Sequence, residues 1–123
     1  FDAHAESAAA LGQRISTHYP TMQVATGSND PAGHSIVVNA TPMGMNDGDP
    51  LPMDVARIER DAYVGEVVMK SEMTAFLSAA AARGCRYQIG SDMLFEQIPA
   101  YLEFFGLPTT TPENLRAVAR LSY

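Results

Sequence analysis

The fold is decided by the stretch SIVVNATPMGM, residues 35–45. Its β-branched run at positions 36–38 predicts a short buried strand of a parallel sheet. Asn39 and Thr41 place polar side chains where this strand ends, and Pro42 prevents its continuation. Because ligands of open parallel sheets bind beyond the carboxyl ends of the strands, residues 39–45 are expected to line a ligand crevice.

A second stretch, GSDMLFEQ at residues 90–97, follows the same plan, with a predicted strand before it and a predicted helix after it. The strand covers residues 86–89. The helix covers residues 92–105, with Ser91 or Asp92 as its N-cap. Pro99 falls inside this helix and is expected to kink it.

Hydrophobic periodicity predicts the remaining elements. Helices are expected over residues 3–19 and 72–83, the second closed by Gly84, and Pro112 opens a last helix. Further strands are expected over residues 22–26 and 63–69, with a single helical turn over residues 54–59. Since short apolar strands alternate with helices, the sequence predicts an α/β domain with a parallel sheet.

Composition restricts the classes of function. The chain has 123 residues, of which 46% are hydrophobic, enough for the core of one domain. A net charge of −6 without a basic patch argues against a nucleic-acid partner. No apolar run approaches the ~20 residues of a membrane span. The single cysteine, Cys85, is expected to be a small core residue, and the three histidines share no metal-site spacing. A cytoplasmic enzyme is the natural interpretation.

Through these two stretches the chain resembles the carboxy-terminal nucleotide-binding domain of the shikimate dehydrogenase family. The family pattern Asn-x-Thr followed by Gly-Met matches Asn39, Thr41, Gly44 and Met45, and the pattern Gly-x-x-Met-Leu-x-x-Gln matches residues 90–97. The resemblance implies a Rossmann-like, doubly wound parallel sheet that is incomplete, because the first βα unit with its Gly-rich turn is missing. Residues 1–123 would form a single partial nucleotide-binding domain, α/β over about 1–90 and helical over 91–123.

The resemblance implies an oxidoreductase that transfers hydride between NAD(P) and a shikimate- or quinate-like cyclic hydroxy acid, such as 3-dehydroshikimate to shikimate. Gly90 would offer its backbone carbonyl to the nicotinamide amide, and Met93 would pack near the ring. Gln97 would hydrogen-bond the hydroxylated substrate, because a carboxamide can both donate and accept. No residue of this chain is assigned a catalytic role. The cofactor-binding residues so implied are Asp2, Asn39, Thr41, Pro42, Val67, Gly90 and Met93, and the substrate-binding residues are Met69 and Gln97.

Three positions depart from the family pattern. Met69 occupies the place of a substrate-contacting tyrosine and cannot donate a hydrogen bond, and Glu66 stands where the family usually has Asp. Both changes shift the expected substrate away from shikimate itself. Asp2 stands among the residues where NADP-binding members carry Asn-Arg-Thr, and an acid there favours the free ribose 2′-hydroxyl of NAD. NAD is therefore the expected cofactor, with NADP as the alternative.

Two parts of the family pattern are missing from this chain, and their absence leads to predictions about the whole protein. No Gly-x-Gly-x-x-Gly turn is present, and the Lys and Asp of the amino-terminal substrate domain have no counterpart. The chain is therefore expected to be the distal part of a longer protein and to be inactive alone. The strand over residues 36–39 would then present an open apolar edge, and either self-association through it or a rearranged strand over residues 22–26 is expected.

Other interpretations of the same residues stay open. Taken alone, Asn39 and Thr41 could simply terminate a strand, Gln97 could be solvated or locally bonded, and Asp2 could cap the first helix. The competing function is a non-catalytic Rossmann-like module that binds a nucleotide or a partner protein. A methylene-tetrahydrofolate or glutamyl-tRNA-type reductase is disfavoured by the pattern at residues 90–97.

Overall fold

The computed structural model describes residues 1–121 and divides the chain into two compact units, residues 1–30 and the part from residue 31 onward. The assignment of the chain to a single partial domain stays a prediction. Among the described residues, none of the helices is both long and apolar enough to cross a membrane.

The first unit consists of α1 (Ala5–His18) and an extended segment that folds back on it. Gly12 is the buried residue of α1, and the side chains of Val24 and Thr26 lie against it. A Cβ added at Gly12 would come within 3.3 Å and 3.2 Å of these two side chains. The predicted strand over residues 22–26 is wrong. The segment is extended, but within the described residues no other strand pairs with it, and a strand requires a hydrogen-bonded neighbour.

The second unit contains the sheet, which has three parallel strands in the order β1 (Ile36–Asn39), β2 (Tyr63–Glu66) and β3 (Arg86–Gln88). The predicted α/β fold with a parallel sheet is confirmed. The second strand ends at Glu66 rather than at residue 69. Its partner β1 ends at Asn39, directly opposite Glu66, so residues 67–69 have no ladder to continue.

The helices of the second unit begin at identifiable caps. Thr74 caps α2 (Ala75–Arg83) by accepting a hydrogen bond from the Leu77 amide, so this helix begins later than predicted, and Gly84 closes it with a φ of 93°. Thr111 caps α4 (Pro112–Val118), as the Thr-Pro pair predicts. The predicted turn over residues 54–59 is the 3-10 helix η1 (Val55–Arg57).

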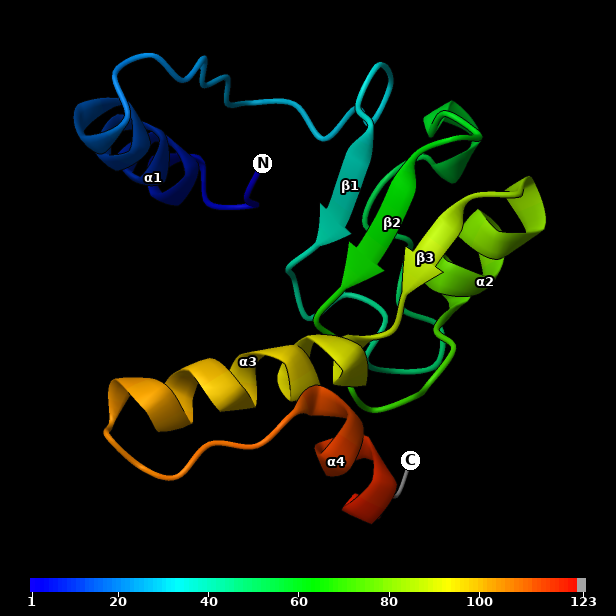
Figure 1. Ribbon diagram of the computed structural model, residues 1–123. Helices are drawn as coiled ribbons and strands as arrows, with labels where there is room; N and C mark the ends of the chain where they lie inside the picture. The colour runs from blue at the N-terminus through cyan, green and yellow to red at the C-terminus, as the bar shows by residue number, and fades with distance from the viewer. Residues whose placement is uncertain (122–123) are drawn as a thin grey trace. The chain divides into compact units, whose positions relative to one another are not determined.

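Helix α3 (Gly90–Phe104) begins two residues earlier than predicted. Ile89 is its N-cap and makes no side-chain capping bond, so the assignment of Ser91 or Asp92 as the cap is wrong. Pro99 lies inside the helix without ending it. Figure 1 shows the arrowheads of the three strands pointing toward α3, which runs past the carboxyl edge of the sheet.

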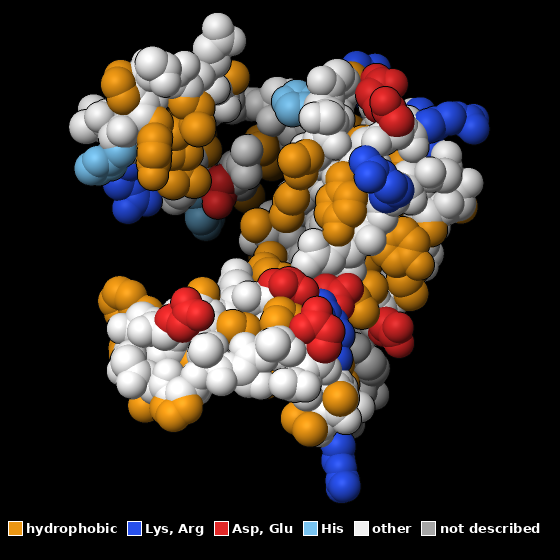
Figure 2. Space-filling view, in the orientation of Figure 1, with side chains coloured by type: hydrophobic (Ala, Val, Ile, Leu, Met, Phe, Trp, Pro, Cys, Tyr) orange, Lys and Arg blue, Asp and Glu red, His pale blue; other side chains and the backbone are white. Residues whose placement is uncertain are grey.

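The core lies between the sheet, α2 and η1. Its most deeply buried members are Ile58, Val64, Phe76, Leu77 and Ala80, and Cys85 is buried with them, as predicted. Near the start of α3, Arg116 of α4 forms ion pairs with Asp92 at 3.0 Å and with Glu96 at 2.9 Å. Figure 2 shows acidic and basic side chains lying side by side in the part of the surface formed by α3 and α4.

Substitution of Gly90 by alanine is expected to destabilise the second unit. A Cβ at this position would lie 2.0 Å from the carbonyl oxygen of Val68, which is backbone and cannot move aside cheaply. We expect Gly90→Ala to lower the free energy of unfolding by about 1–3 kcal/mol in a urea titration of the 123-residue chain. Gly65→Ala is the matched control, because its Cβ would meet only a methyl group at 3.9 Å. Equal stability of the two variants would contradict this packing.

The open edge of β1 makes self-association testable. β1 is an outer strand of the three-stranded sheet, and Ile36 and Val38 are 66% and 53% exposed. Association through this edge stays a prediction, and a charged side chain on an edge strand opposes such pairing. We expect the chain to form dimers or larger species in light scattering and Val38→Lys to return it to the monomer. A wild-type chain that is monomeric at all concentrations would contradict the prediction.

Candidate functional site

The candidate site lies at the carboxyl edge of the parallel sheet, where three chain segments meet. The amide of Val67 donates to the carbonyl of Asn39 at 3.1 Å, which joins the end of β2 to the end of β1. The start of α3 is packed against the same segment, since Gly90 directly faces the carbonyl of Val68. Of the residues predicted to bind a cofactor, Asn39, Val67 and Gly90 are thus brought to one edge.

The side chain of Asn39 organises the turn that follows β1. Its Oδ1 accepts hydrogen bonds from the backbone amide of Thr41 at 3.1 Å and from the Thr41 hydroxyl at 2.6 Å. Its Nδ2 donates to the carbonyl of Met43 at 3.0 Å, and the amide of Met43 donates to the Thr41 hydroxyl at 3.1 Å. We call residues 39–43 the Asn39 turn. These side-chain hydrogen bonds fix the geometry of the turn. Asn39 is only 1% exposed, so water does not compete for its hydrogen bonds.

A polar loop continues this edge beyond the Asn39 turn. Asp49 Oδ2 accepts from the amides of Gly44 at 3.2 Å and Asn46 at 2.9 Å, and Lys70 Nζ donates to Asn46 Oδ1 at 3.1 Å. These bonds tie the loop after β1 to the segment after β2. Between them lies a hollow lined by residues 44–49, 70, 71 and 73–75.

Glu66 is a buried carboxyl group at the same edge, and its hydrogen-bond partner could not be predicted from the sequence. It is 3% exposed, and its Oε1 accepts a hydrogen bond of 2.7 Å from the hydroxyl of Thr74, the N-cap of α2. Within residues 1–121, its Oε2 has no hydrogen-bond partner. Burial raises the pKa of Glu66, and hydrogen bonding by Thr74 and Asn39 opposes this rise. The neutral acid is therefore favoured more than in an exposed glutamate.

The other predicted residues of this unit lie on or beside α3 and after β2. Met93 is half-buried on the first turn of α3, whereas Gln97 is exposed one turn later. The oxygen Oε1 of Gln97 accepts a hydrogen bond of 2.9 Å from the Tyr101 hydroxyl, so the locally bonded alternative describes its state in this structure. Met69 is exposed, three residues beyond the end of β2, and Pro42 lies within the Asn39 turn.

Asp2 belongs to the first unit. Its Oδ1 accepts a hydrogen bond of 2.7 Å from the amide of His4, the N-cap of α1, so it supports the start of that helix. It also lines a hollow formed by the first residues of the chain, one face of α1 and residues 24–26. Its predicted role at a ribose stays a prediction.

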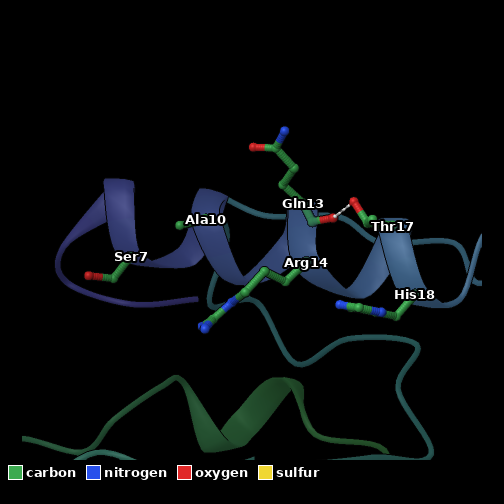
Figure 3. Close-up of a pocket in the computed structure, with 6 residues that line it drawn as sticks. All are labelled: Ser7, Ala10, Gln13, Arg14, Thr17 and His18. Atoms are coloured by element: carbon green, nitrogen blue, oxygen red, sulfur yellow. Dashed lines mark hydrogen bonds between the residues drawn. The ribbon is translucent and has the colours of Figure 1, made fainter.

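A further hollow lies on α1 alone and carries no functional assignment. Figure 3 shows its lining residues, whose side chains leave the helix in different directions. The bond drawn there runs from the Thr17 hydroxyl to the Gln13 carbonyl at 2.8 Å, which is a local contact within the helix. These side chains do not converge on a common point, so a convergent site is not formed. The lining residues are Ser7, Ala10, Gln13, Arg14, Thr17 and His18.

Comparison with known proteins relates the chain to one group of enzymes. No family model matches the sequence. It is 42% identical over 85 residues to the shikimate dehydrogenase (NADP(+)) of Methylocella silvestris, an alignment that covers 68% of this chain and 30% of that protein. The chain thus spans about a third of the length of the curated relatives it matches.

Two solved structures extend the comparison. The quinate dehydrogenase of Corynebacterium glutamicum, in complex with NAD, is 31% identical with a TM-score of 0.79, covering 94% of this chain and 43% of that one. The shikimate 5-dehydrogenase of Thermus thermophilus, in complex with NADP(H) and shikimate, has a TM-score of 0.74 over 94% of this chain and 42% of that one. At 23% identity, this second likeness shows the fold alone. The chain is thus similar, over part of their length, to shikimate and quinate dehydrogenases, and it has a Rossmann-like α/β fold.

Proposed function

We propose that this chain is the nicotinamide-binding portion of a longer cytoplasmic oxidoreductase that transfers hydride between NAD(P) and a shikimate- or quinate-like cyclic hydroxy acid. The observation that carries the proposal is the meeting of the Asn39 turn, Val67 and Gly90 at the carboxyl edge of the sheet. In doubly wound folds this edge is where dinucleotides bind. The 31% identity to a quinate dehydrogenase that binds NAD supports it.

The chemistry of this edge suits a nicotinamide ring. Thr41 supplies a hydroxyl, Val67 and Gly90 supply backbone carbonyl groups, and Met93 supplies a half-buried apolar surface. These groups are uncharged, the polar ones can hydrogen-bond the carboxamide of the ring, and a ring packed against them would be shielded from water. When bound, the nicotinamide supplies the hydride-transfer chemistry. The residues of this chain would hold and orient it, and none of them is proposed as an acid or base.

The substrate side of the site is proposed on α3. Gln97 lies one turn beyond Met93, on the same side of the helix, so a residue near the ring and a residue near the substrate share one face. With Tyr101 donating to Oε1, the amide nitrogen of Gln97 stays free to donate to a hydroxyl or carbonyl oxygen of the substrate. Met69 would contribute an apolar contact.

The competing function is a non-catalytic Rossmann-like module. It is favoured by one observation: Glu66, the buried carboxyl group of this edge, is only 3% exposed, which keeps it from direct contact with a substrate at the surface. Assay of the full-length protein with shikimate and quinate, followed at the NADH absorbance band, separates the two. Turnover supports the oxidoreductase. Binding of NAD without turnover of any cyclic hydroxy acid supports the module.

The role proposed for Asp2 predicts a preference for NAD. A carboxylate near the ribose accepts from a 2′-hydroxyl and repels a 2′-phosphate. We expect the full-length protein to have a higher kcat/KM with NAD⁺ than with NADP⁺, and Asp2→Asn to reduce that ratio about tenfold, equivalent to about 1.4 kcal/mol. Glu6→Gln in the first turn of α1 is the control, because it removes one exposed carboxylate and should leave the ratio unchanged. A KM for NADP⁺ ten times below that for NAD⁺ in the wild type would refute the preference.

The role proposed for Gln97 predicts a selective loss of substrate binding. Gln97→Leu keeps the approximate volume and removes the proposed bond to the substrate together with the bond from Tyr101, so KM for the hydroxy acid should rise roughly fivefold, which corresponds to about 1 kcal/mol. KM for the cofactor should not change. The exposed Glu103→Gln, on the same helix, controls for altered surface polarity. If the cofactor KM rises as much as the substrate KM, Gln97 supports the helix rather than the substrate.

A further inference from the structure

Glu66 is a buried carboxyl group that the proposed function does not use. It stands directly opposite Asn39 in the register of β1 and β2, and its carboxyl accepts from the hydroxyl of Thr74. These three polar side chains come from β1, β2 and the N-cap of α2, and they are 1%, 3% and 4% exposed. A polar side chain this deeply buried is costly unless its hydrogen bonds are satisfied, so their mutual contacts determine whether this region holds its shape.

Asn39 connects Glu66 to the Asn39 turn. Its Oδ1 is occupied by Thr41, and one proton of its Nδ2 is occupied by the Met43 carbonyl. An amide nitrogen carries two protons, so one remains. Asn39 and Glu66 are register partners on neighbouring strands and both are buried, so the Asn39 side chain lies beside the carboxyl group, and its influence lowers the pKa of Glu66. A change at Glu66 therefore reaches the turn through one side chain.

We propose that Glu66 is a positioning residue: acting through Asn39, it holds the Asn39 turn in the conformation that lines the cofactor site, and through Thr74 it ties that turn to the start of α2. The statement that the Asn39 turn lines a cofactor site rests on the proposed function. The coupling between Glu66 and the turn does not, because it follows from the contacts of this chain alone.

The coupling is tested first without any ligand, by amide hydrogen exchange in the 123-residue chain. Glu66→Leu keeps the bulk but removes the acceptor of the Thr74 hydroxyl and the polar neighbour of the Asn39 amide. Relative to the amides of β2, exchange at Thr41 and Met43 should become roughly tenfold faster, because both amides donate within the Asn39 turn. Glu66→Gln, which retains an acceptor oxygen, should restore the wild-type ratio.

A destabilising change elsewhere in the core provides the control. Ile58→Val removes a methylene from a fully buried side chain outside the turn and should accelerate exchange at β2 and at the turn alike. If Glu66→Leu behaves like Ile58→Val, with no excess at Thr41 and Met43, Glu66 has only a structural role and the proposal is overturned.

The pH dependence of stability gives a second readout. Burial raises the pKa of Glu66 above its ordinary value, and the side chains that act on it, Thr74 and Asn39, do not titrate. A raised folded-state pKa stabilises the fold below the ordinary glutamate pKa, and this contribution is lost as the pH rises through the raised value. Urea titrations at about pH 5 and pH 8 should show this loss in the wild type and a smaller one in Glu66→Gln. Equal losses of stability in the wild type and in Glu66→Gln would show that this pH dependence does not come from the Glu66 carboxyl group.

The same variants then connect the turn to the cofactor in the full-length protein. Glu66→Leu should weaken NAD⁺ binding roughly tenfold, whereas Glu66→Gln and Ile58→Val should bind like the wild type. Unchanged binding in Glu66→Leu would contradict the positioning role. Failure of the wild type to bind NAD⁺ would overturn the proposed function instead, and the exchange comparison decides the coupling on its own.

Discussion

The close approach of Gly90 to the Val68 carbonyl is the constraint on which the candidate site depends. It allows α3 to begin directly against the segment that leaves β2, with no side chain between the two backbones. Because β1 is bonded to the same segment through Val67 and Asn39, three parts of the chain that are distant in sequence share one edge. A larger residue at position 90 would displace α3, and Met93 and Gln97 would move with it.

The polar residues Asn39, Glu66 and Thr74 at this edge are buried. Asn39, Glu66 and Thr74 use hydrogen bonds among themselves and with nearby backbone to offset the cost of leaving water. Such a network has few alternative arrangements, so it orders the turn that carries Thr41. A hydride-transfer site needs this kind of order, since the cofactor supplies the chemistry and the protein supplies orientation.

The local pattern of the sequence was sufficient to predict the parallel sheet and the helices of the second unit. The run at residues 36–38, the Thr-Pro pair at 111–112 and Gly84 each act through neighbours close in sequence, so their effect could be derived from spacing. The strand predicted over residues 22–26 failed because strand formation depends on a distant partner, which this sequence pattern does not specify. The start of α3 was misplaced because Ile89 caps it without a side-chain bond.

The site was predictable only in part for the same reason. The sequence could place Asn39 and Thr41 at the end of one strand and Gly90 after the end of another. The hydrogen bond from Thr74 to Glu66 joins the two ends of an irregular loop, in which no hydrophobic periodicity indicates which residues meet. Only the folded chain brings these two side chains together.

The most direct test of the central claim is a crystal structure of the full-length protein with NAD⁺ bound. The account predicts that the nicotinamide ring lies beside Thr41, Val67 and Gly90, at the carboxyl edge of the parallel sheet. A ring bound elsewhere, with this edge covered by packed side chains of the protein, would contradict it.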